Sequence, residues 1–393
     1  MFVHSNNALF MSKVLFDLAS TQPNSNGKRH GGGIYGEVVF KRIVEKQLPI
    51  AVFYDSSKWF NPEMKKLIKE AGIDMYDIST QSLQDIIDSN HFELLYTPLV
   101  EDYLNNVRNC RVKATVHGLR NFELPLDWYR FKYQQEFKIK RFIRFIYRKW
   151  FHENTLQEEK GNWEKRIKPE YDIITVSNHS AYSIKTFFPR FRDKEVKVFY
   201  SPLQYENDQF KGNAKDFSKG NKYFLLVSGN RWEKNNLRAI MALDSLFSQG
   251  VLKDFNVVIT GASSATVYRY KIKNPNKFNF VGYVDDNVLR ELYRNAYCLV
   301  YPSLNEGFGY PPLEAMQFGT PVLASPFASI PEVCGDAVLY FNPFSTEEIK
   351  NRILMICDKE IYNVMSERGV SRFDTIKNKQ KKDLEKLIDY IFE

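Results

Sequence analysis

Residues 305–316 of this 393-residue chain read Asn-Glu-Gly-Phe-Gly-Tyr-Pro-Pro-Leu-Glu-Ala-Met, and this stretch decides the fold. It follows the apolar run Cys298–Tyr301, which is typical of a buried strand. Pro311 and Pro312 suit the entry and first position of a helix, where a missing N–H costs little. A strand that leads through a glycine-bearing loop into a helix predicts an anion site at the helix N-terminus, most naturally for phosphate.

Two carboxylates flank this loop, eight positions apart. Glu306 precedes the glycines, and we expect Glu314 in the first turn of the helix. Gly307 and Gly309 let the backbone approach a ligand without interference from a Cβ atom. One carboxylate can then face a reacting group while the other accepts hydrogen bonds from hydroxyls. The spacing alone leaves an alternative open, in which Glu306 is a solvated loop residue and Glu314 only complements the helix dipole.

Short apolar runs alternate with amphipathic segments along the rest of the chain. The predicted strands of the first half are Val14–Leu18, Ile50–Tyr54, Leu94–Thr97, Val112–Val116, Ile173–Val176 and Val196–Tyr200. Those of the second half are Tyr223–Ser228, Val257–Thr260, Phe278–Val281, Cys298–Tyr301, Pro321–Ala324 and Ala337–Phe341. Between them we predict the helices Glu37–Lys46, Glu63–Ala71, Leu83–Ser89, Leu237–Gln249, Val288–Asn295 and Pro312–Phe318. Continuous apolar strands separated by helices indicate parallel sheets covered on both faces.

The sequence therefore predicts an α/β protein of two doubly wound, Rossmann-like domains that face a central cleft. We place the domains at residues 1–205 and 206–375, joined through the polar segment Gln204–Asn221. Residues 376–393 have helical periodicity and are expected to cross back to the first domain. Because open α/β sheets bind ligands beyond the carboxyl ends of their strands, the residues that follow strands are the candidates for function.

The composition is that of a soluble, core-forming chain, with 44% hydrophobic and 26% charged residues, which excludes disorder. No apolar run is long enough for a transmembrane helix, and the first ten residues resemble no secretory signal. Translation starting at Met11 would leave residues 1–10 as a dispensable tail, which is a hypothesis. The cysteines form no CxxC pair, so we expect free thiols rather than a zinc site or a disulfide framework. They are Cys110, Cys298, Cys334 and Cys357.

The segment from Glu306 to Ser325 resembles the E-x7-E region of glycosyltransferase family 4, whose members are retaining nucleotide-sugar glycosyltransferases with the GT-B fold. Residues 330–337 (IPEVCGDA) are similar to the continuation of that region. Residues 227–235 (VSGNRWEKN) resemble the basic loop of the family, and residues 280–284 (FVGYV) its base-binding segment. The likeness is strong over residues 222–345 and weak in the N-terminal half.

The resemblance implies a role for each matching residue. Glu306 would lie near the hydroxyls of the donor sugar, and Glu314 would hold the ribose. Lys234 and Arg231 would flank the diphosphate and stabilise the departing nucleotide, where negative charge grows. The family usually spaces this arginine further from its lysine, so the role of Arg231 is the weaker inference. The remaining donor-binding residues expected in this half are Gly229, Val284, Gly307, Phe308, Gly309 and Tyr310.

Two features of the first half resemble the family less closely. The glycines at 31–33, including Gly32 and Gly33, would form a loop before a helix that reaches into the cleft. His117 ends a predicted strand where the family commonly has a histidine at the reaction centre. Gly118 follows it where the family often has Asp, which weakens any inference about the sugar. A buried structural histidine is the alternative.

We expect no metal ion and no other cofactor. The chain has no Asp-x-Asp motif, and the adjacent pair Asp285-Asp286 is predicted to cap a helix. The resemblance agrees, because members of the family usually work without metal.

Residues 128–149 are basic and aromatic, with eight basic residues against one acidic residue. Ile139, Ile143 and Ile146 recur at helical spacing, which indicates a basic amphipathic helix of the kind that binds a membrane surface. Helical packing on the first sheet is the alternative; nucleic-acid binding is not supported, because no recognised nucleic-acid motif accompanies the charge. The residues predicted to contact a membrane or acceptor are Arg141, Arg144, Arg148, Lys149 and Trp150.

Taken with the resemblance, these features predict a retaining glycosyltransferase that moves a sugar from a nucleotide-diphosphate donor to a hydroxyl of a glycan or lipid-linked acceptor. The expected setting is the cytoplasmic face of the membrane, in the assembly of a surface glycan such as lipopolysaccharide or capsule. A nucleotide-sugar epimerase of the same shape and a non-catalytic nucleotide-sugar-binding subunit are the alternatives.

Overall fold

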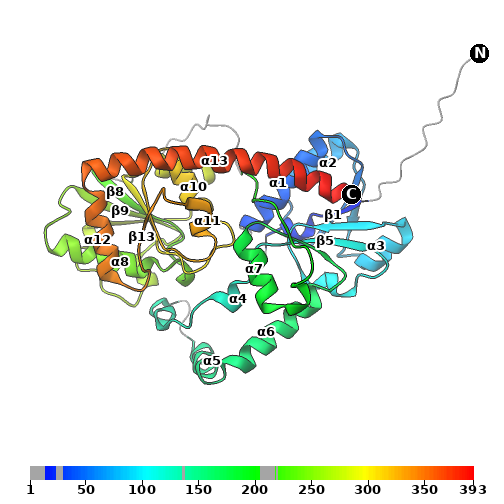
Figure 1. Ribbon diagram of the computed structural model, residues 1–393, viewed down its shortest axis with the longest axis horizontal. Helices are drawn as coiled ribbons and strands as arrows, with labels where there is room; N and C mark the ends of the chain where they lie inside the picture. The colour runs from blue at the N-terminus through cyan, green and yellow to red at the C-terminus, as the bar shows by residue number, and fades with distance from the viewer. Residues whose placement is uncertain (1–13, 24–29, 135–137, 204–216, 218–219) are drawn as a thin grey trace, which may run out of the picture.

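The computed structural model describes residues 14–23, 30–134, 138–203, 217 and 220–393. Two parallel sheets with helices on both faces lie side by side along the molecule (Figure 1). The first has seven strands, in the spatial order β3 (Met75–Asp77), β2 (Ile50–Tyr54), β1 (Val14–Asp17), β4 (Leu94–Thr97), β5 (Arg111–Val116), β6 (Asp172–Thr175) and β7 (Lys197–Val198). The second has six, in the order β10 (Phe278–Gly282), β9 (Phe255–Thr260), β8 (Lys222–Leu226), β11 (Cys298–Tyr301), β12 (Val322–Ala324) and β13 (Leu339–Tyr340).

Both sheets share one topology, in which the chain winds outward from a central strand, first to one side and then to the other. The direction reverses between β1 and β4 in the first sheet and between β8 and β11 in the second. Such a switch point leaves a crevice at the carboxyl ends of the two strands, where open α/β sheets bind ligands. The predicted fold class, two Rossmann-like units in an α/β chain, is confirmed.

Most predicted strands are present, with three differences at the edges. β3 was not predicted, because three half-buried residues on a sheet edge give no periodic signal. The predicted strand Val196–Tyr200 is reduced to the two-residue β7, and Ala337–Phe341 to β13. The linker Gln204–Asn221 lies almost wholly outside the described residues, as does the predicted domain boundary at 205–206, and so do residues 1–10.

Most helices of the first half cover its sheet, and two of them project away from it. They are α1 (Gly31–Glu45), α2 (Pro62–Ala71), α3 (Leu83–Asn90), α4 (Arg120–Glu123), α5 (Ile139–Trp150), α6 (His152–Arg166) and α7 (Asn178–Phe187). Those of the second half are α8 (Asn236–Ser248), α9 (Asp286–Asn295), α10 (Tyr310–Met316), α11 (Ile330–Cys334), α12 (Thr346–Ile356) and α13 (Lys359–Phe392). Figure 1 shows α5 and α6 standing away from both sheets.

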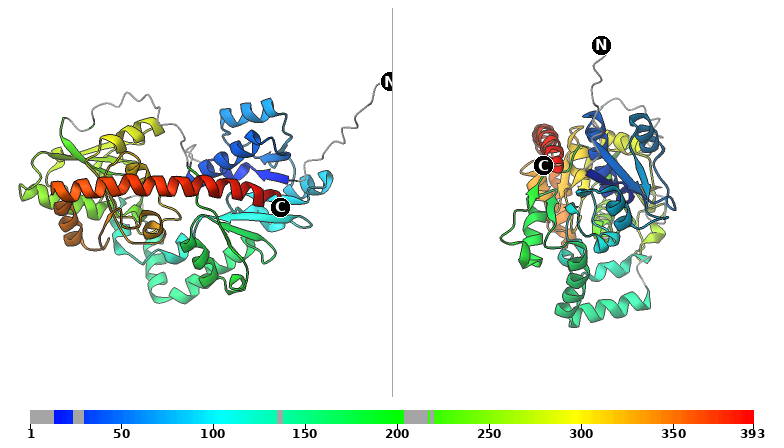
Figure 2. Two further views of the ribbon diagram at one scale, coloured as in Figure 1. Left: turned by 45° about the horizontal axis from the view of Figure 1, so that its top comes forward. Right: turned by 90° about the vertical axis from the view of Figure 1, so that its right-hand side faces the viewer.

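The C-terminal helix α13 connects the two halves. It is continuous over 34 residues, so the predicted segment 376–393 is its C-terminal part rather than a separate element. The left view of Figure 2 shows it running past both units. Near its end Glu385 pairs with Arg42 and Lys46 of the first half, and Asp383 accepts the backbone N–H of Tyr200 at 2.9 Å.

Candidate active site

A cavity of about 520 Å³ lies between the carboxyl ends of the two sheets. Its wall includes His30 and Leu99, which follow β1 and β4, and Ser228, which follows β8. The loop that leaves β11 completes it. Both switch points therefore open into one shared cavity. The wall contains eleven of the predicted site residues: Gly32, His117, Arg231, Lys234, Val284, Glu306, Gly307, Phe308, Gly309, Tyr310 and Glu314.

Two predicted glycines do not line the cavity. The glycine run is the first turn of α1, capped by His30, rather than a loop before the helix. Gly33 faces the backbone at Thr21, where an added Cβ would lie 2.5 Å from the carbonyl oxygen. Gly229 packs on the sheet instead, because its Cβ would lie 2.6 Å from Ile259. Both glycines serve close packing behind the wall.

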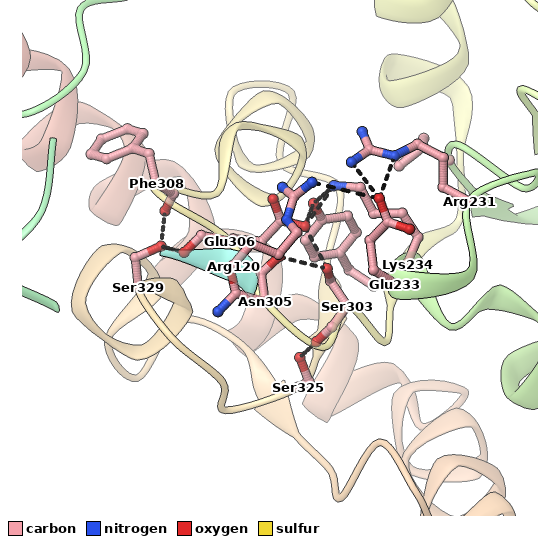
Figure 3. A network of polar contacts seen from close by, with 12 residues as sticks. Arg120, Arg231, Glu233, Lys234, Ser303, Asn305, Glu306, Phe308, Ser325 and Ser329 are labelled. Carbon is pink, nitrogen blue, oxygen red and sulfur yellow. Dashed lines mark hydrogen bonds and ion pairs between the residues drawn. The ribbon is translucent and has the colours of Figure 1, made fainter. Parts of the chain in front are cut away.

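The centre of the site is a buried ion pair (Figure 3). Lys234 Nζ lies 2.5 Å from Glu306 Oε1, and the two side chains are 8% and 10% exposed. The Tyr301 hydroxyl accepts a hydrogen bond from Lys234 at 2.8 Å and donates one to Glu306 at 2.7 Å. Ser303 Oγ donates to the same carboxylate oxygen. The pair is thus held in one geometry by side chains at the end of β11.

This environment keeps Glu306 ionised. Burial by itself would raise its pKa, but the charges of Lys234 and Arg120 outweigh burial and hold the pKa at about 2. Lys234 ends the short 3-10 turn Trp232–Lys234, and Asn235 then takes a left-handed conformation (φ 57°) before α8 begins. This turn aims the ammonium group back toward β11.

Two arginines add positive charge at the same wall. Arg231 donates two hydrogen bonds to Glu233 Oε1, at 2.8 and 2.6 Å. Arg120, from the start of α4 in the other half, lies 3.5 Å from the same oxygen. Figure 3 shows the Arg120 guanidinium beside Glu306 and Lys234. The site therefore combines cations from both halves of the chain with two carboxylates, Glu306 and Glu233.

Glu314 differs from its predicted position. α10 begins at Tyr310, so Glu314 is the fifth residue and lies beyond the first turn, which contains no acidic residue. Gly309 precedes the helix in a left-handed conformation (φ 107°) that favours glycine. Burial raises the pKa of Glu314 to about 7. Its carboxyl group therefore gains or loses a proton near neutral pH.

The loop between β11 and α10 also holds the two halves together. Tyr310 donates to the carbonyl oxygen of Pro202 at 2.7 Å, and its hydroxyl lies 2.6 Å from that of Ser201. Ser177 Oγ donates to the carbonyl oxygen of Gly307 at 2.9 Å. Phe308 packs its ring edge against Tyr200. The residues predicted to bind the donor thus contact the opposite domain as well.

His117 is buried at the cavity wall. Its Nε2 lies 2.9 Å from the carbonyl oxygen of Pro98, and since a carbonyl only accepts, Nε2 carries the proton. Burial lowers the pKa of His117 to about 4, so the ring is neutral at pH 7. It stands edge-on to Tyr35, with the ring centroids 4.7 Å apart.

Three polar residues of this site carry no signal in the sequence alone. Arg120 follows β5 in an unremarkable segment, and Tyr301 and Ser303 end a strand whose apolar pattern hides them. Position after a strand is the only available clue. Among the described residues, no three His, Cys, Asp or Glu side chains gather as a metal site. Asp285 accepts from the N–H of Val288 and caps α9, as predicted.

The residues predicted to meet a membrane lie on α5, away from this cavity. Trp150 and Lys149 are exposed, and Arg148 pairs with Glu159 of α6 at 3.0 Å. The aromatic side chains on one side of α5 pack on residues 128–132 rather than on the sheet. No helix in the described part of the chain is long and apolar enough to cross a bilayer.

Comparison with known proteins agrees with this geometry. Residues 207–372 match the family described as glycosyl transferases group 1. The O-antigen chain mannosyltransferase RfbU of Salmonella typhimurium is 29% identical over 243 residues, which is 60% of each chain. The O-antigen chain mannosyltransferase B of Escherichia coli is 43% identical over 94 residues, a quarter of its length. The chain thus matches less than two thirds of either relative.

Solved structures share the whole fold at low identity. The glycosyltransferase WaaG, involved in lipopolysaccharide biosynthesis, has a TM-score of 0.63 at 14% identity, over 96% of this chain and 99% of its own. Anabaena HepE in complex with UDP-glucose has a TM-score of 0.59 at 16% identity, over 95% and 98%. These neighbours establish the two-domain GT-B architecture. The cavity lies in this fold, and its second-half wall belongs to the part of the chain, residues 207–372, that matches the group 1 family.

Proposed function

We propose that this protein is a glycosyltransferase that moves a sugar from a nucleotide-diphosphate donor to an acceptor hydroxyl, with retention of the anomeric configuration. The observation that carries the proposal is the cavity between the two sheets, where Lys234 pairs with Glu306 and the guanidinium groups of Arg231 and Arg120 lie at the same wall. The group 1 domain over residues 207–372 supports the same reading.

The cations give the site a leaving-group function. When the bond between the anomeric carbon and the β-phosphate oxygen breaks, the electron pair stays on the diphosphate. Positive groups already fixed at that position stabilise the growing charge without reorganisation. Arg231 and Lys234 lie in the wall of the cavity and supply this charge. The proposal therefore requires no metal ion, and chelation with EDTA is expected to leave turnover unchanged.

Retention follows if the acceptor hydroxyl attacks from the side on which the nucleotide departs, and its proton passes to a diphosphate oxygen. A covalent intermediate on Glu306 is disfavoured, since Lys234, Tyr301 and Ser303 all donate to one of its oxygens. Glu306 instead accepts hydrogen bonds or orients Lys234. His117, neutral and fixed by Pro98, offers its ring to the sugar.

Mannose is the first sugar to test, because the relatives RfbU and mannosyltransferase B bear the name mannosyltransferase. Their names also place them in O-antigen synthesis, and we propose a lipid-linked or surface-glycan acceptor on the cytoplasmic face of the membrane. Glu314 would hold the ribose, and Val284 would border the base. The donor panel described below identifies the nucleotide base.

We also propose that α5 rests on an anionic membrane surface. Ile139, Ile143 and Trp150 are 76%, 60% and 75% exposed and share one face of the helix. Basic residues flank this face, and each adds about 1 kcal/mol of attraction to anionic lipid. Co-sedimentation with vesicles should rise with their phosphatidylglycerol content; binding that ignores the anionic lipid would contradict it.

A donor panel tests the activity. The bound nucleotide sugar raises the melting temperature by mass action, and that sugar is then incubated with an acceptor extract. Lys234→Ala should mainly slow turnover, and Glu314→Ala should mainly weaken donor binding. An epimer of the donor formed without acceptor would favour the epimerase alternative. Donor binding without any turnover would favour a non-catalytic subunit.

A further inference from the structure

A second cavity, of about 390 Å³, lies beside the cleft and is lined by arginines. We call it the arginine cavity; the arginines in its wall are Arg120, Arg130, Arg144 and Arg148. Arg120 also lines the active-site cavity, so the two spaces meet at its side chain. Glu233, next to Lys234 in the chain, lies on the same border.

The four arginines outnumber the two carboxylates in the wall, which are Asp127 and Glu233. Asp127 accepts two hydrogen bonds from Arg238, at 2.6 and 2.9 Å, and Arg238 lies outside the wall. Glu233 is shared between Arg231, at 2.6 Å, and Arg120 of the wall, at 3.5 Å. Each acid also serves a cation outside the wall, and four arginines against two acids leave the arginine cavity with a net positive charge.

Two guanidinium nitrogens in this wall lack partners. Nε of Arg120 and Nε of Arg148 are buried and donate no hydrogen bond within the described part of the chain. Arg120 pairs with Glu233 and Arg148 with Glu159, and one acid leaves several of the five N–H donors of each guanidinium group for a further acceptor. Guanidinium groups match phosphate oxygens in both charge and planar geometry. A phosphate or diphosphate is therefore the ligand chemistry that fits.

The helix α5 connects this cavity to the surface proposed to meet the membrane. Arg144, Phe145 and Arg148 form the cavity wall, and Ile139, Ile143 and Trp150 project from a different face of the same helix. A ligand with its phosphate in the cavity would thus have its apolar part within reach of the exposed face. The other end of the same ligand would pass Arg120 and enter the active-site cavity.

We propose that the arginine cavity binds the diphosphate of a lipid-linked acceptor. The lipid chain extends along the apolar face of α5 into the membrane, and the sugar end passes Arg120 into the active site. The proposal rests on the proposed glycosyl transfer and adds the site at which the diphosphate of the acceptor binds. A phospholipid headgroup shares the phosphate chemistry but carries no sugar toward the cleft, and it is distinguished by the test.

Geranyl diphosphate serves as a soluble probe in calorimetric titration, without vesicles and with GDP and UDP present to occupy the cleft. Arg144→Ala should weaken its binding about tenfold, the loss expected for one charge-assisted hydrogen bond. Arg144 is exposed, so the fold should tolerate the change. Lys140→Ala is the matched control: it removes one exposed charge from the same helix but does not line the cavity, and it should bind the probe as the wild type does.

Equal affinity of wild type and Arg144→Ala for geranyl diphosphate would overturn the proposal, as would the absence of any binding. Geraniol binding as tightly as its diphosphate would also overturn it.

In a vesicle arm, phosphatidylglycerol binding that falls with Arg144→Ala but not with Lys140→Ala would assign the cavity to phospholipid headgroups instead. Nucleotide binding by Arg144→Ala is measured in parallel and should be unchanged. A failure of glycosyl transfer with every donor, while the probe still depends on Arg144, would reject the activity and leave the diphosphate site standing.

Discussion

At the scale of single residues, the site is organised around one buried charge pair. Lys234 and Glu306 are both nearly inaccessible, and each satisfies the other together with Tyr301 and Ser303. Removing two charges from water is costly, so such a pair contributes little net stability. What it provides is a fixed position for an ammonium group at the wall of the cavity.

Replacing only one member of this ion pair should destabilise the protein more than replacing both. Lys234→Met leaves the Glu306 carboxylate buried without its main partner and should lower the free energy of unfolding by about 3–5 kcal/mol. Lys234→Met combined with Glu306→Gln should recover part of that loss. Urea unfolding followed by circular dichroism measures both variants. A double variant less stable than the single one would show that Arg120 alone suffices to hold the carboxylate.

The elevated pKa of Glu314 predicts a pH dependence of donor binding. Hydrogen bonds from ribose hydroxyls favour the ionised carboxylate, which is the minor form below pH 7 because burial raises the pKa to about 7. Donor affinity should therefore rise about tenfold between pH 6 and pH 8, as the ionised fraction grows. Calorimetry with the nucleotide sugar measures it. Glu314→Gln should bind weakly and with a flat profile; a wild-type affinity that falls with pH would reject the role.

At the scale of elements, the glycine run shows how one sequence pattern can have two readings. Three glycines predict a flexible loop, but His30 caps them into the first turn of α1. Gly31 is open to space, Gly32 borders the cavity, and Gly33 presses against the carbonyl oxygen of Thr21. The run is needed for packing at one position and for access at another.

This difference can be tested with two neighbouring substitutions. Gly33→Ala would place a Cβ 2.5 Å from a backbone oxygen and should destabilise the protein by about 1–3 kcal/mol. Gly31→Ala meets nothing within 4 Å, and it should be neutral or stabilise by about 0.4–1 kcal/mol. Thermal unfolding of the two variants provides the comparison. Equal melting temperatures would mean that the turn shifts freely to admit the methyl group.

The sequence predicted the central strands well, because buried parallel strands are continuous apolar runs whose ends are marked by polar residues. It did not predict β3 at the edge, where burial is partial and the pattern short. At the site it identified Lys234 and Glu306 through the family resemblance. It could not identify Arg120, because no local pattern tells that α4 of the first domain faces a loop 186 residues further on.

At the scale of the whole molecule, the candidate active site exists only while the two domains are together. Arg120 and His117 come from the first half, and Lys234 and Glu306 from the second. α13 fixes the far side of the interface through Glu385 and Asp383. On the near side, the carboxylate of Glu332 in α11 accepts the backbone N–H groups of Asn178 and His179 at the start of α7. The closed arrangement is thus bonded on both sides of the cavity.

Gly307 lies against the first domain with no room for a side chain. A Cβ at this position would overlap the carbonyl oxygen of His117, a backbone atom that cannot turn aside. Gly307→Ala should therefore force the domains apart, with a larger radius of gyration in small-angle X-ray scattering and a loss of turnover. Donor binding should remain, because Glu314 and Lys234 keep their places in the second half. The matched control is Gly161→Ala in α6, where the methyl group meets nothing within 4 Å and neither quantity should change. If Gly307→Ala kept both the wild-type radius and the wild-type turnover, the transfer reaction would not depend on this contact between His117 and the loop before α10.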